Sequence, residues 1–485
     1  MRKRWLLGCL ILPLACAPHL DSGSDPSRGG AGGGSSGGSG AAGSGAAATG
    51  GASTAGTTGS GGAAATGGTS PTGVAGTMGT GGVSAAGASV LERNNHPSRD
   101  GHFLQPTLTR QAAARMALDT TFTATFNGAV LGAPLYFANG PAGTGIFVVA
   151  TSGNDVYAFD EATGAVVWTT NLGTPASKSG TTGCDGNNPL GVISTPVIDP
   201  TTGTLYVAGA IGDANAITSH SIWAVSLMDG KIKAGYPSDL SRALNFDPKT
   251  HNQRGALSMV GHVVYVPYGG HTGDCVVDVR GRVVAIDTST TPPTVAGWQS
   301  AGQGEAIWAP AGMASAGDGV FAVTGNRLTT TGQHTDSEEI IHVRGMGTLD
   351  KSGSKDFFFP SDWATKDQRD FDLGAVNPIL VNLPGSTGPA LVLTSKDGNG
   401  FIFDSADLGK GPLVTFDVSM QGMNVRSIPT AYVSGSTTFY AIAVEGAWTG
   451  CSSGTVNGSV IMGFALAPSL PAKPTVTLSP SPSNA

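Results

Sequence analysis

The sequence predicts an all-β fold, a β-propeller of six to eight four-stranded antiparallel blades. The first observation behind this prediction is the stretch from Ile146 to Gly173, which has the pattern of three short strands joined by tight turns, with a further strand at Ala133 to Ala138. The second is that five later segments repeat this pattern. The third is physical: a sheet with two apolar faces cannot stand alone, and stacking copies around an axis buries both faces. A tandem of β-sandwiches is the alternative.

The first repeat shows how strands and turns alternate. Residues Asp155 to Asp160 point alternately to two sides, which is the period of a strand. Asp160 can accept backbone N–H bonds across the turn that follows, and Gly164 supplies the positive φ that such a turn needs. The strand after the turn carries Trp168.

The same residues carry a resemblance to a known family. Ala158, Asp160, Thr163, Gly164 and Trp168 match the signature A-x-D-x-x-T-G-x-x-x-W of the PQQ-type repeat. The chain therefore resembles the quinoprotein-like β-propellers, and within them an uncharacterised branch of exported bacterial lipoproteins. The resemblance implies a propeller in which these residues hold the repeat together. It does not by itself imply a cofactor, because one fold hosts many activities.

The pattern also places the other repeats and the segment that precedes them. The later repeats begin at Val192, Gly255, Ile307, Ala375 and Val425. Ahead of the first repeat we expect a short helix around Thr109 to Ala117, and then a strand, Thr121 to Phe126, that completes the last blade. The sequence stops soon after the sixth repeat, so a shortened, inactive copy of a longer propeller is a further alternative.

Residues 1–16 are expected to form an export signal with an anchor site. Arg2, Lys3 and Arg4 precede an apolar run of about ten residues, which is too short to cross about 30 Å of hydrocarbon. The run ends in Leu-Pro-Leu-Ala-Cys, which resembles a bacterial lipobox although proline stands where an aliphatic residue is usual. We favour Cys16 as a lipidated residue. The alternative is a secreted protein that loses Cys16 with its signal.

Residues 17–90 are expected to form a disordered tether. Gly, Ser, Ala and Thr dominate this stretch, and no charged residue occurs between Arg28 and Glu92, so it cannot bury a core. A coil of this kind would hold the propeller domain, residues 91–485, away from a membrane. The expected location is the cell envelope, with the outer membrane favoured. The net charge of −7 gives no reason to expect nucleic-acid binding.

Three cysteines lie in the expected propeller domain: Cys184, Cys275 and Cys451. Export would place them in an oxidising compartment, where disulfides form. We pair Cys184 with Cys275, because both lie in long glycine-rich loops of adjacent repeats, and this leaves Cys451 over. The spacing of His271, Asp274 and Cys275 fits no strong zinc pattern, so no metal site is predicted.

An enzymatic role is the alternative that the resemblance suggests. Quinoprotein alcohol and glucose dehydrogenases hold pyrroloquinoline quinone over a Ca²⁺ ion, and the alcohol-oxidising branch has an adjacent pair of cysteines near the quinone. This sequence has no adjacent cysteines, no C-x-x-C-H haem motif and no recognisable set of calcium ligands. Asp372 fits a structural blade opening better than a catalytic base. We therefore predict no catalytic residue and no cofactor, and a quinone- and calcium-dependent dehydrogenase of sugars or alcohols stays as the alternative.

Loop residues near the starts of the repeats are the remaining candidates for a binding site. Arg254, His271, Trp308 and Arg426 are expected to line the central channel. Arg254, Trp308 and Arg426 take comparable places at first strands and could form a funnel for an anionic ligand. The alternative is that these side chains fill the channel and satisfy backbone carbonyls.

Taken together, these features favour a displayed binding or scaffold module. Its expected partners are a membrane, through the lipid anchor, and a protein or glycan that binds the propeller. An outer-membrane assembly lipoprotein of Gram-negative bacteria likewise joins an anchor to repeats of this type, which supports a binding platform and nothing narrower.

Overall fold

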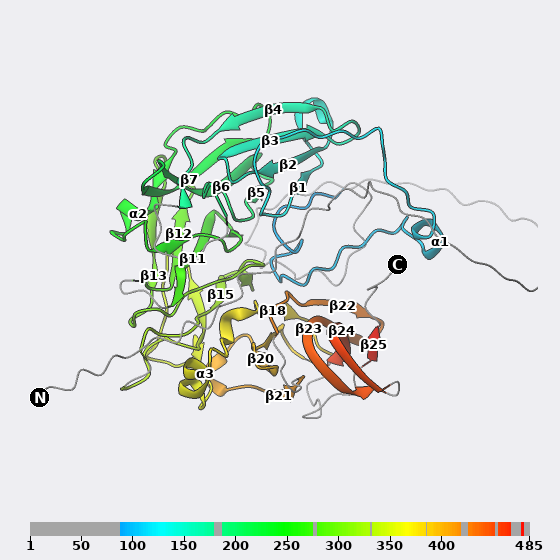
Figure 1. The fold of residues 1–485 in the computed structure, drawn as a ribbon, viewed down its shortest axis with the longest axis vertical. Helices are drawn as coiled ribbons and strands as arrows, with labels where there is room; N and C mark the ends of the chain where they lie inside the picture. Colours follow the sequence, from blue (N-terminus) through cyan, green and yellow to red (C-terminus); the bar gives the residue numbers. More distant parts are fainter. Residues whose placement is uncertain are drawn as a thin grey trace, which may run out of the picture. The chain divides into compact units, whose positions relative to one another are not determined.

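The computed structural model describes residues 88–178, 187–274, 279–329, 332–384, 386–418, 425–451, 454–466 and 477–479. Within these residues the chain forms six antiparallel sheets, which we number 1 to 6 along the sequence (Figure 1). The predicted signal, Cys16, nearly all of the tether, Cys184 and Cys275 lie outside the described residues. The all-β fold with four-stranded repeats is confirmed.

Each sheet is built from four consecutive strands. Sheet 1 contains β1 (Leu135–Phe137), β2 (Ile146–Ala150), β3 (Asp155–Asp160) and β4 (Val166–Asn171). Sheet 2 contains β5 (Val197–Asp199), β6 (Thr204–Gly212), β7 (Ile217–Ser226) and β8 (Ser238–Asp239). Sheet 3 contains β10 (Ser258–Val260), β11 (Val263–Asp274), β12 (Arg282–Asp287) and β13 (Thr294–Gln299), and β11 also pairs with β9 (His251–Asn252).

The second half follows the same plan. Sheet 4 contains β14 (Ala314–Ser315), β15 (Gly319–Val323), β16 (Ile340–Arg344) and β17 (Phe357–Phe358). Sheet 5 contains β18 (Ile379–Val381), β19 (Ala390–Thr394), β20 (Asn399–Asp404) and β21 (Val414–Asp417). Sheet 6 contains β22 (Thr430–Ser434), β23 (Thr437–Cys451), β24 (Gly454–Leu466) and β25 (Thr477–Ser479).

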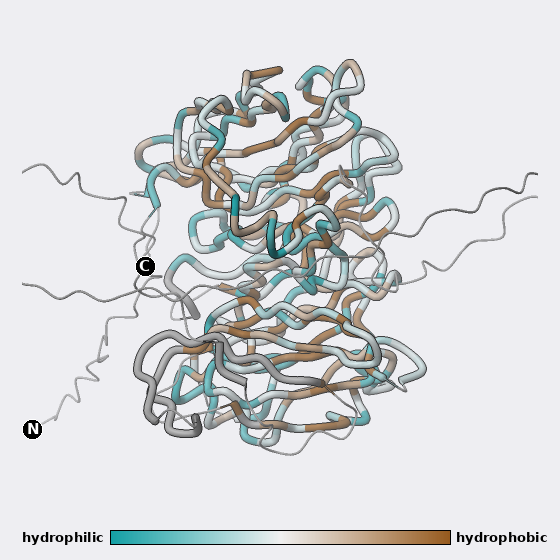
Figure 2. Tube along the Cα trace, turned by 90° about the vertical axis from the view of Figure 1, so that its right-hand side faces the viewer, coloured by the Kyte–Doolittle hydropathy of each residue, from teal (hydrophilic) through white to brown (hydrophobic). Residues whose placement is uncertain are grey.

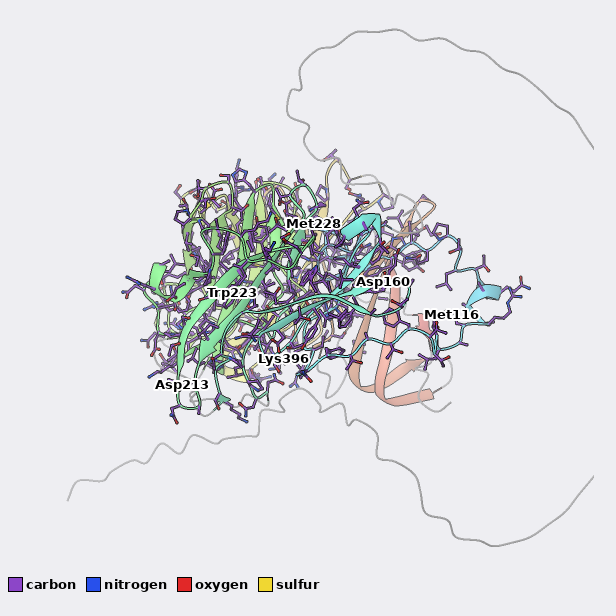
Figure 3. All side chains as sticks on the ribbon, turned by 90° about the horizontal axis from the view of Figure 1, so that it is seen from above. Met116, Asp160, Asp213, Trp223, Met228 and Lys396 are labelled. Atoms are coloured by element: carbon purple, nitrogen blue, oxygen red, sulfur yellow. The ribbon has the colours of Figure 1, made fainter. Side chains whose placement is uncertain are left out.

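Apolar clusters join each sheet to the next. The cluster between sheets 1 and 2 contains Trp223, labelled in Figure 3, whose exposed fraction is 1 %. Four further clusters lie between sheets 2 and 3, 3 and 4, 4 and 5, and 5 and 6. Within the described residues no such cluster joins sheet 6 to sheet 1. Figure 2 shows the hydrophobic residues along the strands and the hydrophilic residues mainly in the loops. The sheets therefore bury their faces by stacking in sequence order.

The signature residues of sheet 1 lie at the turn between β3 and β4 and at the contact with sheet 2. Asp160 Oδ1 accepts hydrogen bonds from the N–H groups of Ala162 and Thr163 and from the Thr163 hydroxyl. Gly164 has a φ of +73°, which favours glycine. Trp168 donates its Nε1–H, at 2.9 Å, to the carbonyl of Leu227, which directly follows β7 of sheet 2.

A segment ahead of sheet 1, Val90–Asp100, contacts the first strand region of every sheet, and we call it the hub segment. Val90 exchanges two backbone hydrogen bonds with Tyr136 of β1. Carbonyls of the hub segment accept N–H bonds from one residue each in β5, β14, β18 and β22: Leu91 from Ile198, Pro97 from Ser315, Ser98 from Leu380, and Asp100 from Ala431. The Arg99 side chain supplies the contact to sheet 3. Because six first strands meet one short segment, they surround it.

The structure corrects the expectation for Thr121–Phe126. This stretch is not a strand and does not complete the last sheet. Its Thr123 N–H donates to the Thr163 carbonyl of sheet 1 at 2.9 Å, and the Phe126 ring centroid lies 6.3 Å from those of Tyr157 and Phe159. Its aromatic side chains pack on an apolar face of sheet 1 instead. The fourth strand of sheet 6 is β25, which the sequence pattern missed.

Helices are few in the described residues: α1 (Arg110–Ala113), α2 (Leu240–Ala243), α3 (Trp363–Arg369), and the 3₁₀ turns η1 (Pro141–Gly143), η3 (Leu373–Ala375) and η4 (Leu408–Lys410). The predicted helix around Thr109 to Ala117 is present as α1, which is shorter and buries no side chain. Figure 1 shows α1 beside the sheets rather than between them, and Met116, labelled in Figure 3, follows it. No helix in this part of the chain has the length and apolar character needed to cross a membrane.

Candidate functional site

Arg99 of the hub segment is fully buried at the meeting point of the first strands. Its Nε donates to the Met313 carbonyl at 3.1 Å and its Nη1 to the Arg93 carbonyl at 2.7 Å. Its Nη2 donates to the Ser258 hydroxyl at 2.7 Å and to the Leu257 carbonyl at 3.2 Å. Four acceptors from three parts of the chain thus converge on one guanidinium, whose rigid fork of donors suits such a junction.

Glu92 supplies the countercharge for Arg99, with 2.7 Å between Arg99 Nη2 and Glu92 Oε2. Burial raises the pKa of Glu92, and the charge of Arg99 offsets part of that rise. Gly312 makes room for the pair, since a Cβ there would lie 2.8 Å from Arg99 Cζ. Removing either partner would leave a buried group without its countercharge, which is costly.

A second arginine of the hub segment has different surroundings. Arg93 is half buried, and burial alone lowers its pKa, because no carboxylate acts on it. It lines a cavity of about 220 Å³ together with Arg254. The remaining walls come from Leu131, Asn187, Ile193, Thr195 and Pro310. We call this space the arginine cavity. It adjoins the hub segment, and the described residues that line it include two arginines and no carboxylate.

Trp308 holds Arg254 at the edge of the arginine cavity. The Arg254 Cζ atom lies 5.0 Å from the centroid of the Trp308 ring, an arrangement that favours a cation over an aromatic face. A Cβ at Gly269 would lie 3.0 Å from the Trp308 ring, so glycine lets the ring pack close to β11. Sequence position in the repeat thus led to Arg254 and Trp308, which the structure brings together.

His271, by contrast, lies in a buried group of histidines between sheets 2 and 3. Its neighbours His220 and His251 interact with it electrostatically. His220 Nε2 lies 3.0 Å from the Pro248 carbonyl and 3.0 Å from the His251 carbonyl. Burial lowers the pKa of His220 to about 3 and that of His251 to about 4. The His220 and His251 rings are therefore neutral at neutral pH.

Arg426 is exposed just before β22 and lines neither the arginine cavity nor a second cavity of about 210 Å³ beside β1.

The structure shows a polar network that the sequence did not reveal, between sheets 4 and 5. Lys396, labelled in Figure 3, places its Nζ 2.8 Å from Asp370 Oδ2 and 3.0 Å from Asp372 Oδ2. Lys366 Nζ lies 2.6 Å from Asp397 Oδ2. A lysine that follows an apolar strand as closely as Lys396 follows β19 could have been noticed, whereas Lys366 lies in α3 and the carboxylate partners of both come from other parts of the chain.

The fit of a quinone with its calcium ion can be tested on the residues that are present. In the described part of the chain no three His, Cys, Asp or Glu side chains gather closely enough to hold a metal ion. The carboxylates near Lys396 are engaged in ion pairs, and the arginine cavity is smaller than the roughly 300–1,000 Å³ of pockets for drug-sized ligands. These observations on the described residues give no positive support for a site that holds quinone and calcium.

Comparison with known proteins gives structural matches only. No protein-family model and no curated protein sequence matches the chain. The quinohemoprotein alcohol dehydrogenase of Comamonas testosteroni matches with a TM-score of 0.54 at 15 % identity, over 82 % of this chain and 68 % of that one. The quinohemoprotein alcohol dehydrogenase ADHIIG of Pseudomonas putida HK5 has a TM-score of 0.54 at 14 % identity, over 79 % and 65 %. BamB from Moraxella catarrhalis matches at 0.30 and 14 % identity, over 64 % and 80 %.

At these identities the first two matches establish the fold alone. This chain spans about two thirds of each of those proteins. Its described residues thus have the fold of the quinoprotein-type β-propellers.

Proposed function

We propose that this protein is a displayed binding module of the bacterial cell envelope, anchored through Cys16 and held at a distance by the tether. The observation that carries the proposal is the hub segment. The predicted tether ends at Val90, and Val90 is already hydrogen-bonded to β1. The tether therefore continues directly into the segment that bonds to all six sheets.

This continuity suits a domain that is held by one end. A load on the tether would reach Val90–Asp100 first, and the hub segment would distribute it over the first strands of six sheets. A junction with a single blade would concentrate the same load on a few hydrogen bonds. The domain then presents its loops, including the arginine cavity, to a partner.

The display part of the proposal can be tested in cells with the full chain and the variant Cys16→Ser. We expect the unaltered protein in the membrane fraction and the variant in the soluble fraction of the envelope or in the medium. An unaltered protein that fractionates as soluble would contradict the anchor and leave simple secretion.

The alternative function, a quinoprotein oxidoreductase, is tested with pyrroloquinoline quinone and Ca²⁺ added to the purified protein. We expect neither a saturable change in quinone absorbance nor a rise in melting temperature. A ligand that binds only the folded form raises the melting temperature by mass action. A saturable rise would therefore contradict the binding-module proposal and start a search for substrates.

A further inference from the structure

We infer that the segment Gln105–Thr121 is a cleavage site for an arginine-directed endoprotease, and that the cut protein stays assembled as two chains. We call this segment the arm. It lies between the hub segment and sheet 1 in the chain. The inference goes beyond the display proposal, because it would hold for a secreted protein as well. It depends on the exposure of the arm, on its arginines and on the contacts of the hub segment.

The arm is exposed along almost its whole length. Every one of its residues except Ala112 is exposed, and Met116 and Leu118 have exposed fractions of 70 % and 88 %. Its helix, α1, buries no side chain, and Figures 1 and 3 show α1 and Met116 to one side of the sheets. In the described part of the chain, the backbone hydrogen bonds of the arm join arm residues to one another. Such a segment can open locally and enter a protease active site without disturbing the sheets.

The arm also carries the first exposed arginines after the tether. Arg110 and Arg115 are both exposed. The tether offers no basic residue between Arg28 and Glu92, and the two arginines of the hub segment are buried or half buried. An arginine-directed protease that follows the chain from the tether therefore reaches the arm before it reaches another accessible arginine.

The other exposed arginines of the described residues differ from those of the arm, because a buried residue stands close to each of them. These pairs of exposed arginine and buried neighbour are Arg242 with Ser241, Arg254 with Gln253, Arg369 with Asp367, and Arg426 with Val425. Cleavage at these arginines would require a packed part of the fold to open first. Cleavage in the arm would not.

The reaction is hydrolysis of one peptide bond. Water adds across the bond between Arg110 and Gln111, or between Arg115 and Met116, and leaves a carboxylate on the arginine and an amino group on the next residue. The first fragment then contains the tether and the hub segment. The second fragment contains the strands of all six sheets.

The hub segment would hold the two fragments together, because its bonds to the sheets are noncovalent and do not involve the arm. Its carbonyls accept N–H groups of sheets 2, 4, 5 and 6 at 2.7 to 2.9 Å, and Val90 exchanges two backbone bonds with Tyr136 of sheet 1. The Thr430 hydroxyl also donates to the Asp100 carbonyl, at 2.7 Å. Main-chain bonds of this kind to strands are a common way in which proteins hold an extended peptide.

Arg99 adds a buried contact between the two fragments. Its guanidinium donates to the carbonyls of Leu257 and Met313 and to the Ser258 hydroxyl, all of which belong to the second fragment. Its countercharge, Glu92, belongs to the first fragment. The hub segment therefore carries a neutral ion pair into the sheets, and the second fragment needs no charge of its own to retain it.

The cleavage site is tested by limited digestion of the full chain with an arginine-specific endoprotease, followed by intact-mass measurement. Within residues 88–485 we expect the first cut after Arg110 or Arg115. The double variant Arg110→Gln, Arg115→Gln should slow the first cut in this range at least about tenfold, because the remaining sites require the fold to open. The matched control is Arg242→Gln, which removes an exposed arginine from α2 and should leave the rate unchanged. A cut at Arg28 leaves the domain whole and is counted separately.

Retention is tested by size-exclusion chromatography of the cut protein at about 1 µM, where fragments stay together only if their Kd is well below that concentration. We expect the two fragments to elute together in native buffer and to separate in urea. The unaltered sequence decides this test. The variant Arg99→Gln sharpens it where its circular dichroism shows that it is folded before cutting, because its fragments should separate at concentrations at which the unaltered fragments stay together.

Two results would overturn the inference: a first cut elsewhere within residues 88–485, or fragments of the unaltered protein that separate in native buffer. Neither result would touch the display proposal, which is decided by membrane fractionation of the full chain and of Cys16→Ser. The failures of the two proposals are therefore distinguishable.

Discussion

Arg93 and Arg99 lie six residues apart in the hub segment, and their charged groups have opposite surroundings. Arg99 is fully buried, with four hydrogen-bond acceptors and the carboxylate of Glu92 around it. Arg93 is half buried beside a cavity, and no carboxylate affects its pKa. The first charge is fully compensated by the fold and the second is not.

The difference separates a charge on which the fold depends from a charge on which it does not. A compensated buried charge contributes to folding only as long as its partners remain, so its loss should appear in stability. A charge without a countercharge contributes little to folding, so its loss should leave stability nearly unchanged.

The largest expected effect is that of Arg99→Gln. Removing the cation leaves the Glu92 carboxylate and three backbone carbonyls buried without a donor, which costs about 3–5 kcal/mol of unfolding free energy. Urea unfolding measures the change. The double variant with Glu92→Gln should lose less than the sum of the single variants, because the two groups interact directly. Additive losses would show that the pair does not act as a unit.

The next effect concerns pH and the buried histidines. His220 and His251 have folded-state pKa values lowered to about 3 and about 4 by burial, whereas the unfolded chain titrates near about 6.5. The stability that these neutral histidines contribute to the folded state is fully present above about pH 6.5. It is lost as the pH falls from there towards the folded-state pKa values, because the unfolded state then binds more protons than the folded state. At about pH 5 we expect a loss of about 2 kcal/mol per histidine.

Urea midpoints at about pH 7 and about pH 5 measure this effect. Carboxylates titrate over the same interval, so the variant His251→Gln is needed to isolate the histidine. Its midpoint should change less between the two pH values than that of the unaltered protein. An identical change in both proteins would show that His251 is not responsible.

A smaller effect is expected at the signature turn. Asp160→Ala removes the acceptor of three hydrogen bonds, so we expect a small loss of stability, as at helix caps and turns. The cost stays modest because solvent can replace the bonds of an exposed carboxylate. Asp160→Asn keeps one acceptor oxygen and should recover part of the loss in thermal unfolding. Equal destabilisation by Ala and Asn would contradict the role of the acceptor.

The smallest effect on stability should be that of Arg93→Gln. Because this side chain has no countercharge to leave behind, the unfolding free energy should stay within about 0.5 kcal/mol of the unaltered protein. Differential scanning calorimetry of this variant beside Arg99→Gln sharpens the comparison directly. A loss as large as that of Arg99→Gln would place Arg93 among the architectural residues.

The sequence predicted the parts of the fold that depend on neighbouring residues. β3 begins and ends where the alternation of side chains placed it, and Asp160 and Gly164 mark a turn that closes within five residues. The hub segment could not be predicted in this way. Its contacts span long separations, such as 158 residues between Arg99 and Leu257 and 330 between Asp100 and Thr430.

The candidate site was predicted only in part, because it too depends on contacts between residues that are far apart in the sequence. Position in the repeat led to Arg254 and Trp308, which do meet, but also to Arg426 and His271, which lie elsewhere. Arg93 was missed, although it is one of the first charged residues after the chargeless tether. Nothing local distinguishes Arg93 from Arg99, because their difference lies in partners that only the folded chain brings near.

The central claim, that one segment joins all six sheets, is tested most directly by amide hydrogen exchange. The N–H groups of Ile198, Ser315, Leu380 and Ala431 belong to four different sheets and all donate to the hub segment. We predict slow exchange of these amides in the unaltered protein and a joint acceleration in Arg99→Gln. Fast exchange in the unaltered protein, or acceleration at only one of them, would contradict the claim.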